Sequence, residues 1–129
     1  IMSAAVSDWT PAGRSDQKMK KTGTKQALEM VRTTDILADL GAHQARASFT
    51  LVGFAAETED VLENAREKCV RKNADLMIAN DVSDPAIGFG SDDNTITIIT
   101  PTTQERVPKA SKSALAETIF DAIVRSQTT

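Results

Sequence analysis

The apolar and polar positions along the chain predict short strands that alternate with helices. Continuous apolar runs between polar turns are typical of buried strands, and a period of two is typical of a half-exposed strand. The expected strands are residues 1–6, 27–31, 48–57, 74–81 and 94–100. Apolar residues at helical spacing predict helices at residues 33–44, 58–73 and 110–124. This alternation favours an α/β fold with an open, largely parallel sheet.

Individual elements carry further expectations. The strands at 1–6 and 48–57 are almost continuously apolar, so they should be buried, the second on both faces. The strand at 94–100 alternates, and its Ile96 and Ile98 should be half-exposed on one face. Residues 8–26 show no periodicity and predict a long loop. The expected helix caps are Thr33 or Thr34, Thr58 and Ser111.

Composition places the chain among ordinary single globular domains. It has 129 residues, 40% of them hydrophobic and 26% charged. A net charge of −3, from 15 basic and 18 acidic residues, argues against nucleic acid or membrane as a partner, so an anion site has to be local. No apolar run approaches the ~18 residues of a membrane-spanning helix. Cys69 is the single cysteine, which excludes a disulfide framework and favours a reduced, cytoplasmic setting.

Three expected strand ends carry candidate ligand-binding residues, because ligands of open α/β sheets bind at the carboxyl ends of strands. They are Asp8, residues 54–57 and residues 80–81. Asp8 suits a magnesium or ribose ligand, and it equally suits a turn before Pro11. These ends therefore mark an edge to inspect and do not yet identify a chemistry.

Basic side chains concentrate at two places. Residues 14–25 contain five basic residues and one acid, which describes either a solvated loop or a clamp for an anion. Lys68 and Lys72 are four residues apart and share one helix face, near a helix end that favours cations in any case. Either cluster alone fits an ordinary solvated surface.

The segment RTTDIL, residues 32–37, is either an ordinary helix start or a phosphate site. In the second case the free amides of Asp35 and Ile36 would face a phosphate, and the Asp35 carboxylate would face a metal carried by that phosphate.

His43 is expected on the surface and Cys69 in the core. GFGSDDN, residues 88–94, lacks calcium-loop spacing and predicts a turn. Neither GxxxxGK[ST] nor GxGxxG occurs. The residues alone thus indicate a domain for a nucleotide or phosphate ligand.

Taken jointly and in order, several segments resemble one family over essentially the whole chain. They are AAVSDW, KMKK, LEMVRTTDILADLG, LVGFAAETEDVLENAREKCVRKNADLMIANDVS and IGFGSDDNTITII. The chain is similar to the synthetase domain of the bacterial bifunctional phosphopantothenoylcysteine decarboxylase/phosphopantothenate–cysteine ligase. The resemblance implies a three-layer, Rossmann-like, largely parallel sheet flanked by helices, with a C-terminal hairpin extension.

The resemblance also implies a reaction in coenzyme A biosynthesis. Family members join 4′-phosphopantothenate to cysteine with CTP and Mg²⁺, through an acyl-cytidylate. The carried-over nucleotide contacts are Met2, Ser3, Ala4, Asp8, Lys18, Thr33, Thr34, Asp35, Ile36, Phe54, Lys68 and Lys72. Lys18 would neutralise the reacting phosphate, with Lys20 and Lys21 as auxiliary charge, and Asp8 would contact nucleotide or metal. The family commonly has proline at the position of Thr34, and both residues suit a helix start.

Family members carry another βαβ portion before the segment that matches AAVSDW, with a glycine-rich turn and an asparagine used in the second half-reaction. Residues 1–129 are therefore expected to be the C-terminal portion of a single synthetase domain, and an incomplete catalyst alone. The decarboxylase domain and its flavin are not expected. The family works as a homodimer in which the lysine loop closes near the neighbour's site, and Ile96 and Ile98 suit such an interface.

Two other functions compete with the ligase. One is a nucleotide-binding module without catalysis, which the missing asparagine region favours for this stretch. The other is a Rossmann-type dehydrogenase, which the missing GxGxxG disfavours. Binding of CTP, ATP or NAD distinguishes the three.

Overall fold

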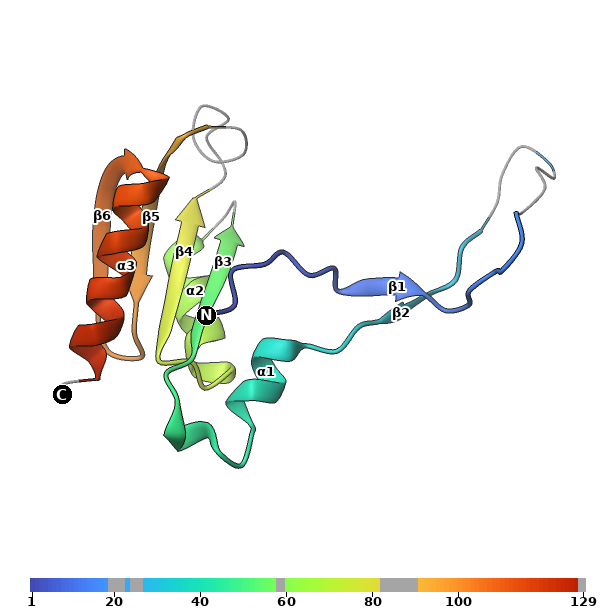
Figure 1. The fold of residues 1–129 in the computed structure, drawn as a ribbon, viewed down its shortest axis with the longest axis horizontal. Helices are drawn as coiled ribbons and strands as arrows, with labels where there is room; N and C mark the ends of the chain where they lie inside the picture. The colour runs from blue at the N-terminus through green and yellow to red at the C-terminus, as the bar shows by residue number, and fades with distance from the viewer. Residues whose placement is uncertain (19–22, 24–26, 58–59, 82–90, 128–129) are drawn as a thin grey trace.

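The main body of the protein is a four-stranded sheet between helices (Figure 1). The computed structural model describes residues 1–18, 23, 27–57, 60–81 and 91–127. The strand order is β3 (Val52–Glu57), β4 (Leu76–Asp81), β5 (Asp93–Ile99) and β6 (Gln104–Ser111). β3 and β4 are parallel, while β5 is antiparallel to both β4 and β6. The predicted α/β class and the C-terminal hairpin are confirmed. The described sheet is mixed and not largely parallel, because β4, β5 and β6 follow one another as antiparallel neighbours.

Two long helices cover opposite faces of this sheet, α2 (Val61–Arg71) and α3 (Lys112–Ser126) (Figure 1). Side chains of β4 alternate between them: Met77 and Ala79 pack toward α2, Leu76 and Ile78 toward α3. Parallel-type strands buried on both faces need such a continuous apolar run. The predictions for 58–73, 74–81 and 110–124 thus correspond to α2, β4 and α3.

The expectation that Ile96 and Ile98 are half-exposed was wrong. Both are buried, 5% and 4% exposed, because α3 folds back over this face of β5. The alternation of apolar and polar residues along β5 therefore reflects two faces of the strand, one covered by α3 and the other only partly buried. The predicted interface at these isoleucines does not exist as a free surface.

The N-terminal segment also differs from its prediction. Residues 1–6 were expected to form a buried strand, but only Met2 is bridged to the sheet, by a parallel pairing with Gly53. The Met2 amide donates to the carbonyl of Val52 over 2.8 Å. β3 is consequently an edge strand, and its Phe54 and Ala56 are exposed instead of buried.

A two-stranded arm leaves the body near this edge (Figure 1). Its strands β1 (Trp9–Pro11) and β2 (Met30–Arg32) are antiparallel, and Trp9 pairs with Arg32. β1 lies within the predicted long loop, and β2 overlaps the strand predicted at 27–31. All six residues of the two strands are exposed. The predictions for Lys20, Lys21, Thr58 and residues 88–90 lie outside the described residues.

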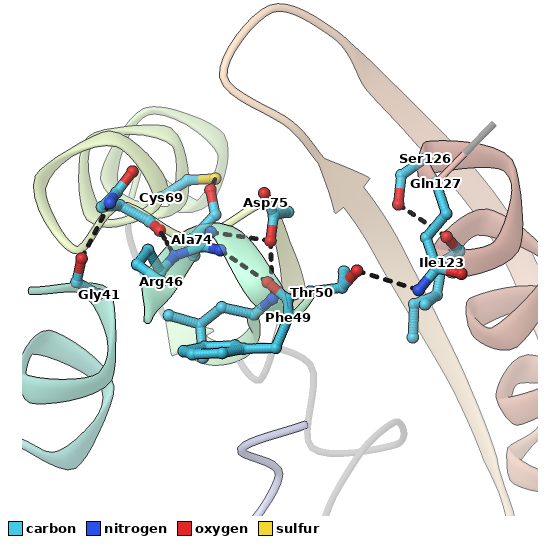
Figure 2. A network of polar contacts seen from close by, with 12 residues as sticks. Gly41, Arg46, Phe49, Thr50, Cys69, Ala74, Asp75, Ile123, Ser126 and Gln127 are labelled. Carbon is cyan, nitrogen blue, oxygen red and sulfur yellow. Dashed lines mark hydrogen bonds and ion pairs between the residues drawn. The ribbon is translucent and has the colours of Figure 1, made fainter. Parts of the chain in front are cut away.

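A polar clasp joins the two crossover loops that precede β3 and β4 (Figure 2). Arg46 begins the short 3₁₀ turn η1 (Arg46–Ser48). Its guanidinium donates to the carbonyls of Asn73 (2.8 Å) and Phe49 (2.9 Å) and pairs with Asp75 at 2.8 Å. The same Asp75 oxygen accepts the Leu51 amide at 2.7 Å. The clasp therefore sets the starts of β3 and β4 relative to each other.

Two glycines allow the short helix α1 (Ile36–Gly41) to sit close to this body. A Cβ on Gly41 would collide with the carbonyl oxygen of Lys72, at the end of α2. A Cβ on Gly53 would lie 2.7 Å from Leu37 and 3.0 Å from Met77, so β3 admits α1 only without a side chain there. These contacts bring the start of α1 next to the last turn of α2.

The helix caps were partly predicted. Ser111 caps α3 as expected, with its hydroxyl accepting the Ala114 amide at 3.2 Å. α1 begins later than expected and is capped by Asp35, so the proposals of Thr33 and Thr34 as caps were wrong. Among the described residues, no helix is long and apolar enough to cross a membrane.

Candidate functional site

A cavity of about 340 Å³ lies beside the free edge of β3. Its walls are the base of the arm, the start of α1 and the last turn of α2. The predicted site residues that line it are Asp8, Thr33, Asp35, Phe54, Lys68 and Lys72. A second cavity of about 160 Å³ shares several of these residues and is also lined by Met2, Ala4, Thr34 and Ile36. The structure thus brings ten of the twelve predicted side chains around two adjoining cavities, while their roles remain predictions.

The cavity lies beside the sheet and not beyond the carboxyl ends of its strands, where it was expected. Its sheet residues are Phe54 and Met77, from the first halves of β3 and β4, and Asn80 does not line it. The reason is that β3 is an edge strand, so the segment after Met2 and the start of α1 enclose space along its free side.

Asp35 uses both of its carboxylate oxygens within the protein. One carboxylate oxygen accepts the Ala38 amide at 3.0 Å, and the other pairs with the Lys72 ammonium at 2.7 Å. The hydrogen bond from Lys72 is the largest of the effects that lower the pKa of Asp35 below its ordinary value. Both oxygens are therefore used within the protein, so the interpretation of Asp35 as a metal-facing residue loses support.

Thr33 fixes the N-terminal segment against the start of α1. Its hydroxyl donates to the carbonyl of Ser7 at 2.6 Å, and its amide donates to the carbonyl of Asp8 at 2.9 Å. This places the Asp8 carboxylate on the cavity wall. Within the described part of the chain, that carboxylate makes no hydrogen bond or ion pair. Asp8 therefore keeps both oxygens available for a ligand.

The cavity wall carries more positive than negative charge. Four cationic side chains face two carboxylates, those of Asp8 and Asp35. The cations are Arg32, Lys68, Arg71 and Lys72. A concave surface with excess charge of one sign concentrates ions of the other sign, so this wall favours an anionic ligand.

Sequence reasoning missed five lining residues, which are Trp9, Arg32, Leu37, Arg71 and Met77. Arg71 follows Lys68 by three positions, so the helical spacing that paired Lys68 with Lys72 also includes it. Arg32 and Trp9 face each other across the arm, with the guanidinium carbon 5.5 Å from the ring centroid. That pairing depends on the arm's register, for which the sequence carries no local signal.

Lys18 and Ser3 are the predicted residues that line neither cavity. Lys18 is exposed and belongs to the segment after β1, which runs away from the sheet (Figure 1). The structure therefore does not bring Lys18 into the cavity of its own chain.

The residues fit a phosphate-borne metal better than a protein-held one. No cluster of three or more His, Cys, Asp or Glu side chains that could hold a metal occurs in the described ranges. Mg²⁺ is commonly bound through one or two carboxylates together with substrate phosphates, and Asp8 alone supplies such a carboxylate here.

The remaining candidates have structural roles. Cys69 is buried, as predicted, and its thiol donates to the carbonyl of Ala74 at 3.3 Å. Burial raises the pKa of this thiol, which makes it a poor nucleophile. His43 is exposed, as expected, and its Nδ1 accepts the Ala45 amide at 3.1 Å.

The fold and the cavity define an α/β domain with a cationic pocket at the edge of its sheet. Residues 1–127 match the family model of the DNA/pantothenate metabolism flavoprotein C-terminal domain, and the chain belongs to this family. The resemblance found in the sequence is thereby confirmed.

Curated relatives include the coenzyme A biosynthesis bifunctional protein CoaBC of two bacteria. The Vibrio cholerae protein is 45% identical over 125 residues, which is 95% of this chain and 31% of that protein. The Bacillus subtilis protein is 49% identical over 98 residues, 76% of this chain and 24% of that protein. The chain thus spans less than a third of the length of these relatives.

Solved structures support the fold. The C-terminal domain of a coenzyme A biosynthesis bifunctional protein CoaBC matches with a TM-score of 0.67 and 30% identity, covering 93% of this chain and 50% of that one. The DNA/pantothenate metabolism flavoprotein from Streptococcus pneumoniae matches with a TM-score of 0.71 over 94% of this chain and 60% of its own. At 24% identity, the second match concerns the fold alone.

Proposed function

We propose that the chain is the C-terminal portion of a phosphopantothenate–cysteine ligase domain acting in coenzyme A biosynthesis. The observation that carries this proposal is the cationic cavity, around which predicted nucleotide contacts from distant segments gather. Membership of the family and the names of the curated relatives support the pathway. The rest of the domain would come from a βαβ portion of the kind that precedes the matching segment in the family.

The proposed reaction has two steps. The carboxylate of 4′-phosphopantothenate attacks the α-phosphate of CTP, which forms an acyl-cytidylate and releases pyrophosphate. The amine of cysteine then attacks the acyl carbon, CMP leaves with the former bond electrons, and the amine loses a proton. The work of the protein is to position the groups and to neutralise charge.

The residues of this chain would divide that work. Lys68 would contact phosphate oxygens, while Lys72 holds Asp35 and thereby the start of α1 in place. Asp8 would hold Mg²⁺ together with the nucleotide phosphates, and the ion would supply further neutralisation of their charge. Phe54, 40% exposed on the cavity wall, would present an apolar surface to the nucleoside.

The arm suits a contact with a second copy of the chain. It exposes large apolar side chains on and beside its strands, which are Trp9, Leu28, Met30 and Val31. A two-stranded sheet alone is marginally stable in water, so a partner surface would stabilise it. A homodimer of this kind would carry Lys18 toward a neighbour's cavity. Light scattering should give twice the chain mass, and a strictly monomeric mass at high micromolar concentration contradicts this part of the proposal.

Calorimetric titration tests which nucleotide the chain binds. CTP should bind the chain, while ATP and NAD should bind much more weakly. Loss of CTP binding in Lys68→Gln, with retention in Lys112→Gln on the exposed start of α3, would connect binding with the cavity. Preferential binding of NAD would favour the dehydrogenase, and binding of no nucleotide would end the proposal.

Catalysis is tested in two proteins. Residues 1–129 alone should bind CTP without forming product, which is also the behaviour of a non-catalytic nucleotide module. In a protein of the relatives' length, Lys18→Gln should abolish acyl-cytidylate formation and leave the fold intact. Normal intermediate formation in that variant would return Lys18 to the status of a solvated loop residue.

A further inference from the structure

The last turn of α2 presents three cations to the cavity, and the predicted site accounts for two of them. Lys68, Arg71 and Lys72 all line the 340 Å³ space. Residues three and four positions apart share a helix face, so the three side chains form one cluster. Cations are favoured at a helix C-terminus in any case, so the spacing alone does not assign Arg71 a function.

Arg71 and Lys72 are held in different ways. The Lys72 ammonium is 2.7 Å from Asp35, and only 19% of its side chain is exposed. The Arg71 guanidinium is 3.3 Å from Glu67, one turn earlier on the same helix, and 60% of its side chain is exposed. An exposed pair of this kind contributes little to stability. Arg71 can therefore exchange its partner at small cost, whereas Lys72 cannot.

Arg71 also acts toward the interior of the cavity. The pKa of Asp35 is lowered first by its hydrogen bond to Lys72, and the charge of Arg71 adds to this effect. Arg71 lines the same cavity as Asp35, so the guanidinium lies on the cavity wall. A planar guanidinium binds two phosphate oxygens with a rigid fork of donors, whereas an ammonium acts as a point charge on a flexible stem.

We propose that Arg71 binds the terminal phosphates of the nucleoside triphosphate and that Glu67 holds it in the empty site. This inference rests on the proposed function and extends it, because it identifies the residue that discriminates a triphosphate from a monophosphate. Binding transfers the guanidinium from the Glu67 carboxylate to phosphate oxygens, and no covalent bond changes.

The test compares affinities for CTP, CMP and inorganic pyrophosphate by calorimetry. Arg71→Gln should lower the affinity for CTP and for pyrophosphate by about ten-fold and leave that for CMP nearly unchanged. Arg71→Lys should recover only part of the loss, because it restores the charge without the two-pronged geometry. Glu67→Gln should raise the affinity for CTP by a few-fold, since the competing carboxylate is gone.

Arg66→Gln is the matched control. Arg66 lies on the same helix and its loss changes the net charge equally, but it contacts Gln104 at 3.3 Å and does not line the cavity. The CTP-to-CMP preference of Arg66→Gln should equal that of the wild type. Equal CTP-to-CMP preferences in Arg71→Gln and Arg66→Gln would overturn the inference.

If the wild type binds pyrophosphate through Arg71 but does not bind CTP, the anion site stands and the proposed ligase function falls. If it binds neither, both fall.

Discussion

The main sheet and the β1–β2 arm are built in opposite ways. In β4, residues 76–79 are each at most 1% exposed, and helices cover both faces. In the arm, every residue of both strands is exposed, and the strands pair with each other. The body thus buries its apolar side chains with residues of this chain. The arm leaves its apolar side chains exposed, so a partner would have to cover them.

The cavity lies where these two regions meet. The body contributes Phe54, Lys68 and Lys72, and the arm base contributes Trp9 and Arg32. The site thus combines one wall from the packed body with a second wall from the arm base, whose position depends on what the arm contacts.

The largest difference is expected from leucine truncation in the two regions. Leu76 in β4 is 1% exposed, and Leu28 beside β2 is 62% exposed. Leu76→Ala should reduce the free energy of unfolding by about 2–5 kcal/mol because it leaves a cavity between the sheet and α3. Leu28→Ala should change it by less than about 0.5 kcal/mol. Urea unfolding followed by circular dichroism measures both, and similar losses would remove the contrast between body and arm.

Next in size is the removal of arginine ion pairs. Arg46→Met would leave the Asn73 and Phe49 carbonyls and the Asp75 carboxylate without their donor. The expected loss is about 2–3 kcal/mol, since the Arg46 side chain is only 15% exposed and its removal takes the donor from three acceptors. Arg14→Met removes an arm pair whose side chains are more than 90% exposed and should cost less than about 0.5 kcal/mol. A loss below 1 kcal/mol for Arg46→Met would show that the clasp does not hold the crossover loops.

The smallest effect concerns pH. The Lys72 hydrogen bond, and other nearby charges, hold the pKa of Asp35 below its ordinary value. The resulting stabilisation is present above the ordinary carboxyl pKa and is lost as pH falls through the lowered value. Asp35→Asn keeps a capping side chain but removes the charge. Between pH 6 and pH 3 the wild type should therefore lose up to about 1 kcal/mol more stability than this variant.

Asp16→Asn, in the arm, is the control for that measurement. Asp16 is 92% exposed and lies 3.8 Å from Arg14, so its replacement should leave the pH dependence of unfolding unchanged. Identical pH profiles for the wild type and Asp35→Asn would mean that the Asp35–Lys72 pair adds nothing to stability.

The sequence predicted an element correctly where its local pattern of apolar and polar residues matches its burial in the fold. β4 is a continuous apolar run and is buried on both faces, and Ser111 precedes α3 and caps it. The prediction failed where burial depends on distant segments. Ile96 and Ile98 are buried by α3, which begins more than ten residues later, and residues 1–6 lack the second neighbour that a buried strand needs.

The candidate site shows the same division. The resemblance identified ten residues that the structure places around the two cavities, although they come from segments far apart in the chain. The pairing of Asp35 with Lys72 could not be read from sequence, because it depends on the approach of α1 to the end of α2. That approach depends on Gly41, whose importance becomes visible only beside the Lys72 carbonyl.

Hydrogen exchange with and without saturating CTP tests the central claim most directly. If CTP occupies the cavity of the body, backbone amides in residues 33–40 and 66–73 should exchange more slowly with CTP, and those of β6 should be unchanged. Saturating CTP that leaves 33–40 and 66–73 unprotected would contradict the assignment of this cavity as the nucleotide site.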